Sequence, residues 1–149
     1  MKAYFVQHAV AHGGDVDPER SLTVAGQAQA QKVAQHLRQR GITLSTVFHS
    51  GKKRAQQTAQ IFAEAFGAPC EQLDGLNPND DPQQVLAGIV QADAMYVGHL
   101  PNIQRLANLV ITGESEIEAI RFSNAAVACV DIDQDDSRLA WLITPTLCE

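Results

Sequence analysis

Patterns typical of strands and patterns typical of helices alternate along this chain, and no other feature constrains its fold as strongly. Short apolar runs rich in aromatic and β-branched residues predict strands, buried ones at 2–6 and 94–99, and longer stretches with an apolar residue every three or four positions predict helices. The predicted strands lie at 2–6, 45–50, 69–73, 94–99, 124–133 and 137–145, and the predicted helices lie at 21–41, 52–67, 80–90 and 101–113. Such alternation favours parallel pairing, because a helix can make the crossover that two parallel strands need.

The residues that end these segments complete the fold prediction. Gly41 and Gly67 each follow a predicted helix. Asp81 and Pro82 suit the cap and the first turn of another. The polar segment 134–136 separates the last two strands and is short enough for an antiparallel hairpin. The predicted fold class is therefore α/β: a three-layer sandwich with a mainly parallel central sheet, helices on both faces and a C-terminal antiparallel hairpin.

Composition narrows the class of protein. The 149 residues are 45% hydrophobic, which suits one domain spanning 1–149 with a single core. The formal net charge of -6 argues against nucleic acid as a partner, because a phosphate backbone is bound by an excess of Lys and Arg. The N-terminal segment lacks the features of a secretory signal, and no apolar run could span a membrane. Three cysteines without a C-x-x-C pair suit a reducing compartment, so we expect a cytoplasmic protein with no membrane partner.

Unusual polar residues stand where three of the predicted strands end. Gln7 and His8 follow the first strand, Ser50 and Gly51 follow the second, and His99 follows the fourth. In open α/β sheets, ligands bind outside the carboxyl ends of the strands. We therefore expect these residues to converge on one site.

Two histidines near an arginine at converging strand ends suit phosphoryl transfer through a phosphohistidine. A neutral imidazole is a good nucleophile toward phosphorus, and a covalent intermediate divides one hard displacement into two easier ones. Arg54 lies at the start of a predicted helix, where its guanidinium and the free backbone N–H groups would bind phosphate oxygens. His99 would donate a further hydrogen bond. Lys52 and Lys53 would raise the local potential in an otherwise acidic protein.

Four ordered motifs carry a resemblance to a known family. The chain reads QHA at 7–9 where the family has Arg-His-Gly, and RSLTVAG at 20–26 where it has Arg-x-Leu-Thr-x-x-Gly. It reads SGKKRAQQT at 50–58 where the family has Ser-Pro-x-x-Arg-Ala-x-x-Thr, and VGHLPNI at 97–103 where a strand ends in His-Leu-Pro. On these motifs the chain resembles the histidine phosphatase superfamily, of phosphoglycerate-mutase-like fold, and within it the SixA-type protein phosphohistidine phosphatases.

The resemblance implies a hydrolase and assigns a role to each residue of the site. His8 would be the nucleophile, and Arg54 and His99 would complete the catalytic set. The residues that would contact the substrate phosphate are Gln7, Arg20, Ser50 and Gly51. No metal and no cofactor would take part. The partner would be a phosphohistidine-bearing signalling protein, such as a histidine-containing phosphotransfer domain.

The chain departs from the family pattern beside the nucleophile. Gln7 replaces an arginine and so removes a fixed charge and a bidentate fork, and Ala9 replaces a glycine. Gly51 stands in the proline position of the second motif. Removal of one preorganised donor costs roughly a hundred- to a thousandfold in rate. Two alternatives to a phosphohistidine phosphatase therefore stay open: a catalytically impaired phosphate- or phosphoprotein-binding module, and a phosphatase of small phosphate esters.

The leaving group bears on this choice. Members of the superfamily that hydrolyse phosphate esters carry an additional acid to protonate an alkoxide, whereas the acids at 74–81 read as turn and cap residues. Imidazole leaves phosphorus more readily than an alkoxide, which favours a phosphohistidine substrate. His8 and His12 have the i, i+4 spacing of a metal pair, but that spacing shares a face only on a helix, and this segment is predicted to be strand and loop.

Overall fold

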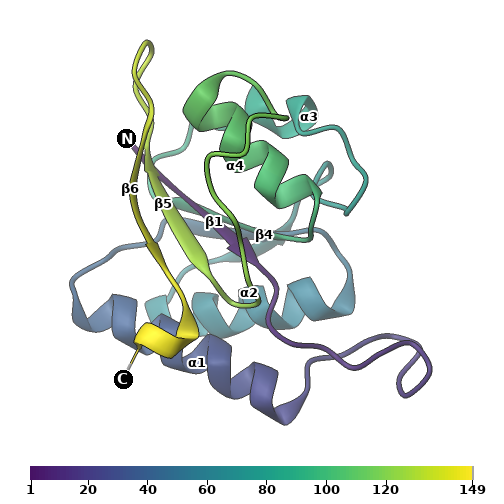
Figure 1. The fold of residues 1–149 in the computed structure, drawn as a ribbon. Helices are drawn as coiled ribbons and strands as arrows, with labels where there is room; N and C mark the ends of the chain where they lie inside the picture. Colours follow the sequence, from purple (N-terminus) through teal and green to yellow (C-terminus); the bar gives the residue numbers. More distant parts are fainter. Residues whose placement is uncertain (149) are drawn as a thin grey trace.

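A mixed β-sheet lies at the centre of the protein, whose computed structural model describes residues 1–148 (Figure 1). The strands are β1 (Lys2–Gln7), β2 (Thr46–His49), β3 (Cys70–Gln72), β4 (Ala94–Gly98), β5 (Val127–Asp131) and β6 (Arg138–Ile143). Their order in the 6-stranded sheet is β3-β2-β4-β1-β5-β6. The first four pair in parallel, and β5 pairs antiparallel with both β1 and β6. The mainly parallel sheet and the C-terminal hairpin are confirmed.

Helices cover both faces of the sheet, as the alternation predicts (Figure 1). The helices α1 (Val24–Gln39) and α2 (Lys53–Phe66) lie on one face, and α3 (Gln83–Leu86) and α4 (Asn102–Thr112) lie on the other. A short 3-10 helix, Pro145–Leu147, follows β6 and packs beside α1. Side chains alternate along β1, so that Tyr4 and Phe5 enter different core clusters on opposite faces of the sheet. The three-layer sandwich is thus confirmed.

A close approach of two backbone segments fixes the start of α1. Thr23 caps the helix, because its Oγ1 accepts a hydrogen bond of 2.9 Å from the Gly26 N–H. The Thr23 N–H donates to the Val10 carbonyl at 3.1 Å. A Cβ atom on Gly26 would lie 2.0 Å from that same carbonyl oxygen. Glycine is therefore required at position 26 for α1 to pack against the segment that follows β1.

One predicted helix is shorter than its sequence pattern. The pattern predicts a helix over 80–90, whereas α3 spans Gln83–Leu86. The N-cap of α3 is Pro82 and not the predicted Asp81, although Asp81 Oδ1 accepts from the Gln83 N–H at 2.9 Å. Beyond α3 the Gly88 N–H donates to the Val85 carbonyl three residues earlier, so the backbone tightens into a turn. Glycine costs about 1 kcal/mol relative to alanine inside a helix, and this cost favours the turn.

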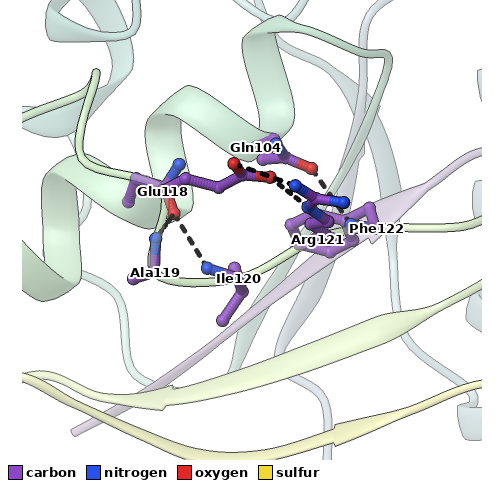
Figure 2. A network of polar contacts seen from close by, with 7 residues as sticks. Gln104, Glu118, Ala119, Ile120, Arg121 and Phe122 are labelled. Carbon is purple, nitrogen blue, oxygen red and sulfur yellow. Dashed lines mark hydrogen bonds and ion pairs between the residues drawn. The ribbon is translucent and has the colours of Figure 1, made fainter.

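Side chains of α4 fasten the connection between α4 and β5 (Figure 2). Asn108 Oδ1 accepts from the N–H groups of Ala119 and Ile120 at 3.1 and 3.3 Å, and Gln104 Oε1 accepts from the Phe122 N–H at 3.0 Å. Asn108 is 3% exposed, so its bonds are shielded from water. This connection leads directly to Asn124, which contacts the end of β1.

Candidate active site

His8 lies just beyond the end of β1, with its backbone held on both sides. Its N–H donates to the Gly98 carbonyl at 3.0 Å, and its carbonyl accepts from Asn124 Nδ2 at 2.9 Å. The ring Nδ1 lies 2.7 Å from the Ala9 carbonyl oxygen. A carbonyl can only accept, so Nδ1 carries the proton of the neutral ring. The lone pair is therefore on Nε2.

The surroundings of His8 favour this neutral form. Burial lowers the pKa of His8 to about 4, and the positive charges of Arg54 and Arg20 act in the same direction, while the hydrogen bond to Ala9 opposes them. The side chain is 9% exposed. At neutral pH His8 is thus an unprotonated imidazole with a free Nε2, the form that a nucleophile requires.

His99 lies beside His8, with ring centroids 5.0 Å apart. His99 is 2% exposed, and its Nε2 lies 2.7 Å from Ser50 Oγ. The Ser50 hydroxyl also accepts from the Lys52 N–H at 3.3 Å, so its own proton is free to bond to His99 Nε2. In that arrangement the neutral ring carries its proton on Nδ1, which is buried and has no partner among the described residues. Burial, together with nearby cations headed by Arg54, lowers the pKa of His99 to about 3.

Arg54 occupies the first turn of α2 and is half-buried. Its Nε is buried without a hydrogen-bond partner in the described chain. Burial and the charge of Arg20 lower the pKa of the Arg54 guanidinium. Thr58 joins the first two strand ends, since its Oγ1 donates to the Arg54 carbonyl at 2.8 Å and accepts from the Ala9 N–H at 3.0 Å. Arg54 is therefore held by its own helix within electrostatic reach of both histidines.

Arg20 reaches the site from the loop before α1. Its backbone has a left-handed φ of 52°, and its Nε donates to the His12 carbonyl at 3.0 Å. Arg20 and Arg54 line an open groove of about 700 Å³ together with Lys52 and Lys53. His12 thus contributes a backbone oxygen that orients Arg20.

Gln7 and Ala9 flank His8 in ordinary conformations. Gln7 ends β1 in register with Gly98, and its carbonyl accepts from the Ala125 N–H at 3.0 Å. Its side-chain Oε1 is buried without a partner among residues 1–148. The non-glycine residues with positive φ do not include Ala9. The methyl group of Ala9 therefore imposes no backbone strain beside His8.

Gly51 gives the second strand end a conformation that proline cannot adopt. Its φ is 94°, whereas a proline ring holds φ near −65°. The Gly51 N–H donates to His49 Nδ1 at 3.0 Å, a bond that a proline could not make. Burial lowers the pKa of His49, which keeps Nδ1 available as an acceptor. Sequence reasoning missed this pairing, although the glycine in the proline position was its visible signal.

Two acidic residues of the 74–81 segment have structural partners. Asp80 accepts from the Asn77 N–H at 3.0 Å, and Asp81 accepts from the Gln83 N–H at the start of α3. Asn102 holds the same loop against α4, because its Nδ2 donates to the carbonyls of Gly75 and Asp80. Within residues 1–148 no group of three or more His, Cys, Asp or Glu is arranged to hold a metal ion. In the same part of the chain, none of the helices is sufficiently long and apolar to cross a membrane.

Comparison with known proteins extends this picture. An uncharacterized protein from Picosynechococcus sp. is 32% identical over 125 residues, covering 77% of this chain and 76% of that protein. The structure of the protein histidine phosphatase SixA, in complex with tungstate, superposes with a TM-score of 0.87 at 24% identity and covers 98% of both chains. A protein of Agrobacterium tumefaciens assigned as a SixA phosphohistidine phosphatase superposes with a TM-score of 0.78 at 25% identity, over 97% of both chains.

The family model of the histidine phosphatase superfamily (branch 1) matches residues 5–79. This range holds the first two strand ends and the loop that carries Arg20. Together with the fold of the whole sheet, the match confirms the sequence-based expectation of a phosphatase family. The chain belongs to the histidine phosphatase superfamily.

Proposed function

We propose that this protein is a metal-independent phosphohistidine phosphatase in which His8 is the covalent nucleophile. The observation that carries the proposal is the hydrogen bond from His8 Nδ1 to the Ala9 carbonyl, which leaves the lone pair on Nε2. The ring of His99, whose centroid lies 5.0 Å from that of His8, and the charge of Arg54 would bind and stabilise a phosphoryl group on His8. The match to the superfamily over 5–79 and the likeness to a protein assigned as SixA support the same activity.

The reaction proceeds in two displacements at phosphorus. His8 Nε2 attacks the phosphoryl group and a new N–P bond forms. The P–N bond of the substrate breaks with its electron pair going to the departing imidazole, which carries a proton on its other ring nitrogen and so leaves as a neutral ring. Water then attacks phosphorus on His8, inorganic phosphate leaves, and His8 regains its lone pair. Arg54 and Arg20 balance the charge on the phosphoryl oxygens, and His99 donates through Nδ1.

The chemistry of the site supports a phosphoramidate as the substrate. Asp80 and Asp81 each accept a hydrogen bond from a backbone N–H of their own loop, so we infer that neither serves as a proton donor to a leaving alkoxide. Imidazole departs with less assistance. The groove beside Arg54 is open enough to admit the surface of a protein that carries the phosphohistidine.

We extend the proposal to the cellular setting. Cys70, Cys129 and Cys148 are unpaired, which supports a reducing compartment such as the cytoplasm. A phosphorylated signalling protein, such as a histidine-containing phosphotransfer domain, is the proposed partner. We also propose that residues 1–149 make one histidine-phosphatase domain, since the two SixA likenesses extend over 98% and 97% of the chain.

One observation favours a second candidate function, a binding module that has lost turnover. Gln7 stands where the family has arginine, and its Oε1 is a buried acceptor beside a site that needs donors. A protein with this defect would still bind phosphate through Arg54, Arg20 and the free N–H groups at the start of α2.

The test incubates the protein with a phosphohistidine protein and with p-nitrophenyl phosphate, and measures phosphate release. We expect hydrolysis of the phosphohistidine protein, its loss in His8→Ala, and its retention in His36→Gln, a histidine of α1 remote from the strand ends. Phosphate binding without hydrolysis of either substrate would contradict the enzyme and support the binding module. Efficient ester hydrolysis that disappears in His8→Ala would transfer the assignment to small phosphate esters.

A further inference from the structure

Positive charge is concentrated at one place on an otherwise acidic protein. The chain has 17 Asp and Glu against 11 Lys and Arg. Four of those 11 basic residues line the groove of about 700 Å³ beside the candidate site, and they are Arg20, Lys52, Lys53 and Arg54. Glu19 is the one acidic residue in the lining. The groove therefore has a local charge opposite to that of the whole chain.

These four cations have no carboxylate partners within the described chain. The ion pairs of residues 1–148 use other basic residues, namely Lys2, Arg105, Arg121 and Arg138. Arg20 bonds to a neutral carbonyl, and its charge lowers the pKa of Arg54. Uncompensated like charges destabilise a folded protein. Their concentration here indicates an anionic ligand that balances them when it is bound.

The groove is larger than one phosphoryl group requires. A volume of about 700 Å³ falls in the range of sites that hold ligands of many atoms. The charges of Arg54 and Arg20 lower the pKa of His8, and the charge of Lys52 lowers the pKa of His99 less than that of Arg54 does. Both lysines are exposed at the start of α2, where flexible stems present their ammonium groups to solvent. Lys52 therefore acts on the phosphoryl site through its charge, and the exposed ammonium groups of both lysines are also accessible to a partner at the edge of the groove.

We propose that Lys52 and Lys53 form a docking surface for the carboxylates of an acidic protein patch next to the phosphohistidine. This inference rests on the proposed function and names the chemistry of its partner. Arg54 and Arg20 hold the phosphoryl group, while the two lysines select and orient the protein that carries it. Two exposed, flexible ammonium groups suit carboxylates on a protein surface, because such charge pairs need neither a fixed hydrogen-bond geometry nor an enclosed pocket.

The test reverses the charge of the docking surface without substituting Arg20, Arg54 or a histidine of the phosphoryl site. The variant Lys52→Glu/Lys53→Glu is compared with Lys32→Glu/Arg38→Glu, which changes the net charge equally at exposed positions of α1. Each is assayed on a phosphorylated histidine-containing phosphotransfer domain with an acidic surface and on phosphoimidazole, which has no carboxylate. We expect the lysine variant to lose roughly ten- to a hundredfold in kcat/KM on the domain, and a several-fold smaller loss on phosphoimidazole, which senses only the changed charge of the groove. The α1 variant should retain both activities.

Further measurements separate the failure of this inference from failure of the proposed function. Equal losses on both substrates would place the lysines in the phosphoryl site and overturn the docking surface, while the phosphatase stands. If the parent hydrolyses neither substrate, the phosphatase fails. In that case the docking surface is tested by the affinity of the His8→Ala protein for the phosphorylated domain. A lower affinity when Lys52 and Lys53 are also changed to Glu would support the docking surface, and an unchanged affinity would overturn it. Lysine-dependent binding to anionic lipid vesicles, with none to the domain, would also overturn it.

Discussion

At the scale of single residues, His8 and Gln7 make opposite contributions to the candidate site. His8 has every feature of a nucleophile: its proton is fixed on Nδ1 by Ala9, its Nε2 is free, and burial keeps it neutral. Gln7 precedes it with an unpaired buried oxygen where the family pattern has a cation. The nucleophile is thus fully prepared by its surroundings, whereas the neighbouring position 7 lacks the cation that the family pattern has there.

The first prediction concerns Gln7. We expect Gln7→Arg to raise kcat/KM on a phosphohistidine substrate by roughly tenfold, because the change replaces an unpaired acceptor by a fixed charge with several donors. Gln7→Leu, which keeps the size and removes the amide, should lower it. The measurement is phosphate release under initial-rate conditions, with phosphate affinity measured in parallel. A fall in both quantities for Gln7→Arg would mean that the pocket has been rebuilt around glutamine.

The second prediction concerns the titration of His8. A nucleophile with an ordinary pKa would be half protonated near pH 6.5, whereas burial lowers the pKa of His8 to about 4. In an NMR titration we expect the His8 ring signals, assigned by comparison with His8→Asn, to have a midpoint well below 6.5. Arg20→Ala should raise that midpoint, since it removes one of the charges that disfavour the imidazolium. A midpoint at or above 6.5 would contradict the described surroundings of the ring.

At the scale of elements, the start of α1 packs closely against the segment that follows β1. We expect Gly26→Ala to destabilise the protein by roughly 1–3 kcal/mol, the usual cost of overpacking, because the new Cβ would lie 2.0 Å from the Val10 carbonyl. Gly14→Ala is the matched control, since its Cβ would have nothing within 4 Å. Urea denaturation measures both changes. Equal midpoints for the two variants would show that α1 shifts without cost.

The amide side chains of α4 support His8 from a distance. Asn108 holds two backbone N–H groups of the connection that ends at Asn124, and Asn124 bonds to the His8 carbonyl. We expect Asn108→Ala to destabilise the protein by about 1–3 kcal/mol, because two N–H groups lose a buried partner. Phosphatase activity should also fall. Arg121→Ala breaks an exposed pair in the same network and should change neither quantity measurably (Figure 2). Equal effects of the two variants would contradict this account.

Elements differ in how far their sequence predicts them. The buried strands follow from short apolar runs and the three long helices from apolar periodicity, because the core between helices and sheet imposes both patterns. The shortening of α3 depends on a turn at Gly88 that competes with an otherwise helical pattern. The bonds between Asn108 and the 119–120 segment join residues 11 and 12 positions apart, and no periodicity marks them. The convergence of His8 with His99 was predictable, since parallel strands end at one edge of a sheet.

At the scale of the whole molecule, the site concentrates positive charge in an acidic protein. The groove cations lie at the same edge of the sheet as two buried, neutral histidines, and an anion would relieve the repulsion among the cations. Burial and nearby cations lower the folded-state pKa of both His8 and His99, whereas unfolded histidines titrate near 6.5. Between those values the unfolded chain binds more protons than the folded one. Because proton binding by His8 and His99 differs between the folded and unfolded states, the free energy of unfolding must depend on pH.

The last prediction follows from this linkage. The free energy of unfolding should fall as pH drops from 6.5 toward 4, because each histidine must stay neutral in the folded protein while it gains a proton in the unfolded chain. Carboxylates contribute to the same trend, so the comparison is with His8→Gln, whose free energy of unfolding should decline less steeply over this window.

Inorganic phosphate should raise the Tm of the parent, because a ligand that binds only the folded state stabilises that state, and it should raise the Tm less in Arg54→Gln. Thermal unfolding at several pH values, with and without phosphate, measures the two pH profiles and the two effects of phosphate. Parallel pH profiles for parent and His8→Gln would mean that His8 is protonated as readily in the folded protein as in the unfolded chain.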